Sequence, residues 1–203
     1  MFVASPTGIS CARPGNTGTW SCEIPNGNGG FATISGIATA DADDAVAAAQ
    51  TWATTNLGAN AVALGAGTNT VAAGAGAIAI GNNAKASGTR AIALVADSEA
   101  SGNNAVAVGN TAAARGIDTI AVGRGATVTA VGNGGVAVGA ATSVNGDGDV
   151  AIGRNSKTQT TSPISTGSNI SNVAIGDGAT AYGGSTAMGT QANSQGASSI
   201  AIG

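Results

Sequence analysis

The sequence contains no histidine, and only 8% of its 203 residues are charged. Without histidine, the chain has no Ser-His-Asp or Cys-His catalytic arrangement and lacks the commonest transition-metal ligand. Its seven lysines and arginines are spread along the chain, whereas nucleic-acid binding requires clustered cations. We therefore expect no enzyme activity, no metal or other cofactor, and no nucleic-acid partner.

Large apolar side chains are also scarce. Aromatic residues make up 2% of the chain, whereas alanine and glycine contribute 45 and 34 residues. The chain therefore has little material for a thick core, but 43% hydrophobic residues and a net charge of −3 are not typical of disorder. No apolar run is long enough to cross a membrane, and the start lacks a secretion signal. We expect an ordered segment without membrane contact, which is a mature part or a fragment if the protein is exported.

Two cysteines, Cys11 and Cys22, lie in an N-terminal segment that is rich in glycine, proline and asparagine. A disulfide between them would close a small hairpin and indicate an oxidising compartment, and the alternative is two free thiols. We favour the disulfide.

An internal repeat of the form apolar-Ala-apolar-Gly dominates the sequence after residue 60, and its commonest step is 14 residues. In one copy Val95 replaces the glycine, and in another Thr186 replaces the first apolar residue. The copies begin at positions 62, 78, 92, 106, 120, 136, 150, 173, 186 and 200. Ten copies in register predict a repeat architecture.

Each unit reads as a short strand, a glycine turn, a second weaker strand and another glycine turn. Apolar residues two apart share one face of a strand, so we predict that Ile120 and Val122 face the interior of the coil. In the second half of a unit, Ala84 and Ala86 share a face opposite Lys85. Such units stack as a parallel β-solenoid, with equivalent strands about 4.8 Å apart.

A single stack of such coils lacks enough buried apolar surface to offset the conformational entropy of ordering it. We expect the alanine of each motif strand to point outward, where a small side chain suits close approach of another chain. The sequence therefore predicts an obligate oligomer.

One helix is predicted over residues 41–56. Aspartates at its start interact favourably with the helix dipole, and Gly58 follows its end. Val46, Ala49 and Ala53, with the nearby Ala42 and Ala45, provide a seam of small residues along it.

The ten units over residues 62–203 resemble the head repeats of trimeric autotransporter adhesins, the YadA-like heads. The resemblance implies an all-β fold, a left-handed parallel β-roll of about 14-residue coils. It also implies a homotrimer around a threefold axis. Such a head is an extracellular part of a protein at the bacterial cell surface, and its outer-membrane anchor lies outside the segment.

The segment Asp44-Ala45-Val46 with Gln50 is similar to the neck motif of the same family, although Ala47 and Thr51 replace its Asn and Leu. In the family a neck usually follows a head, which suggests that residues 1–40 end a preceding head element. We therefore divide the chain into a small N-terminal element with a disulfide (1–40), a neck-like helix (41–57) and β-roll head repeats (58–203).

Two functions fit this organisation. The first is an adhesin head that binds host extracellular matrix, cell-surface molecules or other bacteria through its outer surface. The alternative is a passive spacer that displays another module. Ice binding ranks third, because the Thr-x-Thr pairs fall at different places in the coil.

The 23-residue step between Val150 and Val173 contains an insertion, and insertions in solenoids project from the side, where binding residues often lie. The candidate adhesive residues are Arg154, Lys157, Gln159, Thr160, Pro163 and Ser165. The alternative binding surface is the flank of the roll, with Lys85, Arg115 and Gln191. The acidic turn 145–149 is read as a solvated turn rather than a calcium site, and the Gly-rich stretches as turns rather than phosphate loops.

Overall fold

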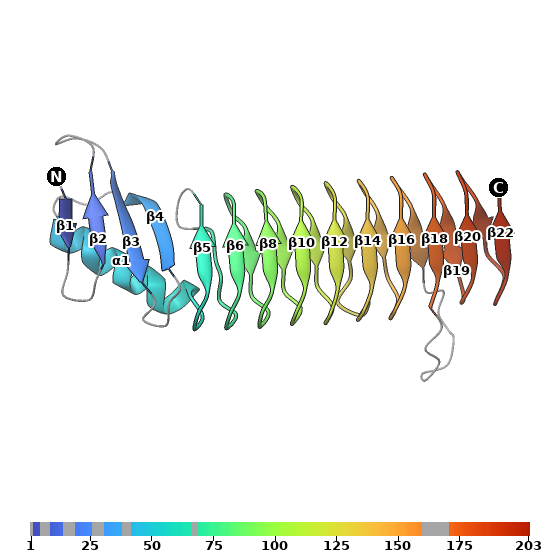
Figure 1. Cartoon of the computed structure of the whole chain (residues 1–203), viewed down its shortest axis with the longest axis horizontal. Coiled ribbons are helices and arrows are strands. Elements are labelled where there is room, and N and C mark those ends of the chain that lie inside the picture. The colour runs from blue at the N-terminus through green and yellow to red at the C-terminus, as the bar shows by residue number, and fades with distance from the viewer. Residues whose placement is uncertain are drawn as a thin grey trace.

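The computed structural model describes residues 2–4, 9–13, 19–25, 31–37, 42–65, 69–159 and 171–203. The chain forms a long β-solenoid with a small sheet and a helix at its N-terminal end (Figure 1). The solenoid consists of two parallel sheets, which confirms the architecture predicted from the repeat.

The N-terminal sheet is antiparallel. Its strands are β1 (Phe2–Ala4), β2 (Ser10–Ala12), β3 (Trp20–Pro25) and β4 (Phe31–Ile37), paired in sequence order. Cys11 lies opposite Cys22 across β2 and β3, and a disulfide joins the two residues.

Helix α1 (Ala42–Asn56) lies against β2, β3 and β4, and it ends at Asn56, as predicted. Its fully buried residues include Ala45 and Ala49, while Val46 and Ala53 are partly buried against the core. Trp52 is also buried on this face, with 8% of its surface exposed, although the predicted seam did not include it.

The repeat strands form one long sheet with the N-terminal strands, because β4 pairs in parallel with the first of them. These strands are β5 (Val62–Leu64), β6 (Ile78–Ile80), β8 (Ile92–Leu94), β10 (Val106–Val108), β12 (Ile120–Val122), β14 (Val136–Val138), β16 (Val150–Ile152), β18 (Val173–Ile175), β20 (Thr186–Met188) and β22 (Ile200–Ile202). Every pair of neighbours is parallel and in register, so that equivalent motif residues form straight columns.

The weaker strands of the coils form the second sheet, as predicted, and it has eight strands in the described residues. They are β7 (Lys85–Ala86), β9 (Glu99–Ala100), β11 (Ala113–Ala114), β13 (Thr127–Val128), β15 (Ser143–Val144), β17 (Lys157–Gln159), β19 (Thr180–Tyr182) and β21 (Asn193–Ser194). A bridge between Val71 and Lys85 extends this sheet by one coil toward the helix.

The N-terminal unit closes the first end of the solenoid on both sheets. On the long sheet, β4 covers β5. On the second, Leu57 bridges to Ala72, and the Ala72 amide donates a hydrogen bond of 3.1 Å to the carbonyl oxygen of Asn56 at the end of α1. Neither strand edge of the first coil is therefore left unpaired toward the N-terminus.

Alanine fills the interior of the solenoid, and the prediction that Ile120 and Val122 face inward is wrong. Ala121, between them, is 0% exposed, whereas Ile120 is 39% exposed. Ala84 and Ala86 share a face opposite Lys85, as predicted, and the structure turns that face inward and Lys85 outward. A coil of about 14 residues encloses too little space for branched side chains from both sheets, so the small residues occupy it and the branched residues face out.

The largest fully buried aliphatic side chains of the solenoid's described residues, Val128 and Val144, lie beside a glycine. A Cβ atom added to Gly135 would lie 2.8 Å from Val144 and 3.0 Å from Val128. The missing side chain of Gly135 thus makes room for two larger ones, which keeps the packing dense.

Turn glycines form columns along the solenoid because backbones of successive coils approach closely there. A Cβ atom at Gly88 would lie 2.0 Å from the carbonyl oxygen of Gly102, and one at Gly102 would lie 1.7 Å from that of Gly116. A second column contains the motif glycines, such as Gly109 with φ of 135°. Val95 stands in that column with φ of 86°, a strained conformation for a β-branched residue.

Candidate interaction surfaces

The long sheet presents a continuous stripe of large apolar side chains on its outer face. We define the apolar stripe as the two residues that flank the central alanine in each repeat strand of the long sheet, from β5 to β22. Ile80, Ile120, Ile152 and Met188 are 40%, 39%, 39% and 43% exposed. Contiguous apolar surfaces of this extent are rarely left in water, which makes the stripe a candidate contact surface between chains.

The outer face of the second sheet is polar instead. The parallel register places one column of residues on it, which contains Lys85, Glu99, Thr127, Ser143 and Lys157, with the buried Ala113 between Glu99 and Thr127. Because the two sheets share one interior, this polar face and the apolar stripe point in opposite directions.

Polar side chains in the turns connect successive coils. The Asn83 amide donates to the Asp97 carboxylate at 3.1 Å, and the Asn104 amide donates to Asp118 at 2.7 Å. The Arg115 guanidinium pairs with Glu99 at 2.8 Å. These exposed contacts add modest stability and fix the coil stacking.

Only part of the predicted adhesive segment lies within the described residues. Lys157 and Gln159 belong to β17, whose neighbours are β15 and β19, so they are part of a regular coil rather than of the insertion. Arg154 lies in the preceding turn and forms an ion pair with Asp177. Thr160, Pro163 and Ser165 lie outside the described residues.

The two carboxylates of the acidic turn 145–149 have separate surroundings. Asp149 is fully buried and accepts hydrogen bonds from the backbone and side-chain amides of Asn172 at 2.6 and 3.1 Å. Asp147 is exposed and accepts from the backbone amide of Asn133 at 2.9 Å. One carboxylate therefore stabilises the interior and the other the turn stack. Within the described ranges no three acidic, cysteine or histidine side chains come together as a metal site.

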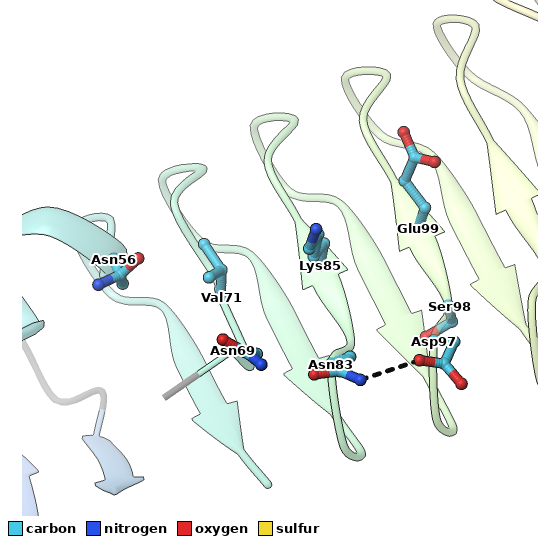
Figure 2. A pocket seen from close by; sticks show the side chains of 8 residues that line it. All are labelled: Asn56, Asn69, Val71, Asn83, Lys85, Asp97, Ser98 and Glu99. Carbon is cyan, nitrogen blue, oxygen red and sulfur yellow. Dashed lines mark hydrogen bonds between the residues drawn. The ribbon is translucent and has the colours of Figure 1, made fainter. Parts of the chain in front are cut away.

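A groove of about 800 Å³ lies on the second sheet beside the end of α1, and the sequence did not predict it. Figure 2 shows two rows of side chains in it, Val71, Lys85 and Glu99 on the strands and Asn69, Asn83 and Asp97 at the turns. Asn56 closes the groove on the helix side. The sequence signal available was Lys85, an outward cation on the flank. The groove itself depends on bringing the helix end beside the first coils.

The protein-family model described as YadA head domain repeat (2 copies) matches residues 72–94, 100–126, 130–156 and 183–203 of the sequence. These matches fall on the coils of the solenoid and begin after the N-terminal sheet and the helix. No curated protein matches the chain. No helix in the described part of the chain is both long and apolar enough to span a membrane.

Proposed function

Since the chain belongs to the YadA head family and is an adhesin head of the trimeric autotransporter type, we propose that three copies pack through the apolar stripe and adhere through their polar outer surface. The observation that carries this proposal is the contrast between the two outer faces, one apolar and one polar. The passenger is exposed at the cell surface, and we propose that segments outside this one attach it to the outer membrane. The family is structural and adhesive, and we assign the chain no catalytic role.

The apolar stripe supports the trimer more directly than the reasoning from sequence did. The sequence analysis placed the motif alanines at the contact between chains, but these alanines are buried inside each roll. The branched residues are the ones left in water. Burial of apolar area at about 25 cal/mol per Å² makes a stripe that runs the length of the solenoid a strong driving force for association.

Replacing Ile120 with aspartate should dissociate the trimer. The carboxylate would enter an apolar contact in each of three chains without a partner, at several kcal/mol per chain. Light scattering of the unchanged protein should give about three times the 18.8 kDa chain mass, and the variant a lower mass. Ser143→Asp places the same charge on the polar face and should leave the mass unchanged. A trimeric Ile120→Asp variant would contradict the use of this face.

For adhesion, we propose that the insertion after β17 is the contact element. The candidate contact residues are Arg154, Lys157 and Gln159 of the coil that precedes the insertion, together with Thr160, Pro163 and Ser165. The outward position of Lys157 supports this, because it places a positive charge on the polar side of the roll next to the insertion. Arg154 is exposed in the preceding turn, where it pairs with Asp177. Ligands are proposed to be host matrix or cell-surface molecules, or other bacteria, which repeated contacts on three chains hold by avidity.

Shortening the insertion should reduce adhesion and leave the fold intact. Nine residues between Gln159 and Ser171 would be removed with Gly167 retained, which restores the 14-residue step and places glycine seven residues after Gly153, as in other coils. Adhesion to immobilised matrix proteins and to cells should fall at least tenfold, with unchanged mass and melting temperature. If adhesion is undiminished, the insertion is not the contact element, and the flank of the roll is the adhesive surface. An intact trimer that adheres to nothing would favour the spacer.

A further inference from the structure

The groove beside α1 contains two carboxylates whose hydrogen-bonding capacity is largely used within the chain. Asp97 accepts from the amides of Asn83 at 3.1 Å and Asn110 at 3.3 Å. Glu99 accepts from two nitrogens of Arg115 at 3.2 and 2.8 Å. The negative charge of the groove is therefore already engaged and partly neutralised.

The side chains left without partners are donors. Among the described residues, neither the Lys85 ammonium nor the Asn69 amide takes part in a hydrogen bond or ion pair, and both are exposed. Figure 2 places Lys85 in the middle of the groove, between Val71 and Glu99 of the adjoining coils. An unpaired ammonium next to a row of turn amides is a site for one anionic group.

We propose that this groove binds a carboxylated saccharide, with its carboxylate on Lys85 and its hydroxyl groups on the amides of the turn row. A single carboxylate suits the site better than a phosphate, since Asp97 and Glu99 would repel a doubly charged group more strongly. All the lining residues except Val71 carry polar or charged groups, which suits the hydroxyl groups of a saccharide.

The dimensions of the groove agree with a short oligosaccharide. Its volume of about 800 Å³ lies within the usual range for small-ligand sites. Asn69, Asn83 and Asp97 come from successive coils and are therefore spaced by about 4.8 Å along the solenoid. Such a row offers donors and acceptors at intervals close to the length of one sugar ring.

The groove stays accessible in the proposed trimer. It lies on the outer face of the second sheet, which points away from the apolar stripe. The groove proposal goes beyond adhesion, because it names a ligand class and a site separate from the insertion. It rests on the proposed function only for the claim that the polar face is turned outward.

Binding to the intact trimer would be measured by calorimetry and by saturation-transfer NMR. The probes are 3′-sialyllactose, whose carboxylate belongs to a sialic acid, and a hyaluronan tetrasaccharide, whose carboxylates belong to uronic acids. Lactose, which carries no carboxylate, is the neutral comparison. We expect saturable binding of at least one acidic sugar, at least tenfold tighter than that of lactose. Lys85→Gln should weaken that binding at least tenfold, and Asn69→Ala should weaken it less.

Arg124→Gln is the matched control, because it also removes one exposed positive charge. Arg124 lies in a turn several coils away from the groove and is not among the residues that line it, so its replacement should leave saccharide affinity unchanged. Equal loss in both variants, equal affinity for lactose, or no binding of either acidic sugar would overturn the proposal. Adhesion of the same trimer to matrix proteins is measured in parallel. A trimer that adheres without binding the sugars refutes the groove and leaves the adhesive function standing.

Discussion

An aspartate in place of Ala121 should prevent the solenoid from folding. Ala121 is 0% exposed in the middle of β12, and its in-register neighbours on both sides are Ala107 and Ala137. The interior offers neither the volume for a carboxylate nor a cation to pair with it. An unpaired buried charge costs several kcal/mol, which is comparable to the total stability of many domains. Circular dichroism and thermal melting should show loss of cooperative unfolding.

Ala141→Asp controls for the charge itself. Ala141 lies in an exposed turn with φ of 57°, and Asp97 occupies the equivalent turn position of another coil with φ of 59°. Aspartate tolerates this conformation better than alanine does, so the melting temperature should stay constant or rise slightly. If the Ala121→Asp protein folds, the interior contains space or water for the carboxylate, and the alanine side chains do not fill it as described.

A single methyl group at Gly102 should be nearly as damaging. The added Cβ would lie 1.7 Å from the carbonyl oxygen of Gly116, and a backbone atom cannot move aside without separating two coils. We expect a loss of about 3 kcal/mol in the free energy of unfolding of each chain, at the upper end for overpacked sites. Denaturant unfolding of the Gly102→Ala trimer would measure it.

Gly134→Asn is the comparison for this variant, because no atom lies within 4 Å of a Cβ added at Gly134. Gly134 has φ of 65°, and Asn104 adopts φ of 56° at the equivalent turn position of an earlier coil. This variant should unfold within about 1 kcal/mol of the original protein. Similar losses in both variants would show that backbone entropy, rather than contact between coils, explains the glycines.

The repeat predicted the two-sheet solenoid and its coil length, but it did not determine which face of the main strand lies inside. In Val-Ala-Val or Ile-Ala-Val, period two separates the branched residues from alanine without assigning either face to the interior. Branched residues usually mark a core, and that rule misplaced Ile120 and Val122. The second strand held the needed signal, because Ala84 and Ala86 must share one interior with the motif alanines.

Other features depended on contacts between distant residues. Nothing local in residues 31–37 indicates that β4 pairs in parallel with β5, some thirty residues later. No large apolar residue lies three or four positions from Trp52, so the sequence does not indicate that its side of the helix is buried. Its burial results from the sheet that packs against α1. The groove at Lys85 likewise forms only when the end of that helix meets the first coils.

The covered first coil gives the rod a direction of growth. In a repeat protein each coil is stabilised mainly by its neighbours, so the first one to form lacks a template. Here β4 and the end of α1 supply that template on both sheets, and the disulfide between Cys11 and Cys22 restrains the sheet that contains β4. We therefore expect residues 58–65 and 69–77 to order first, on this preformed surface, and later coils to add one by one toward the C-terminal end.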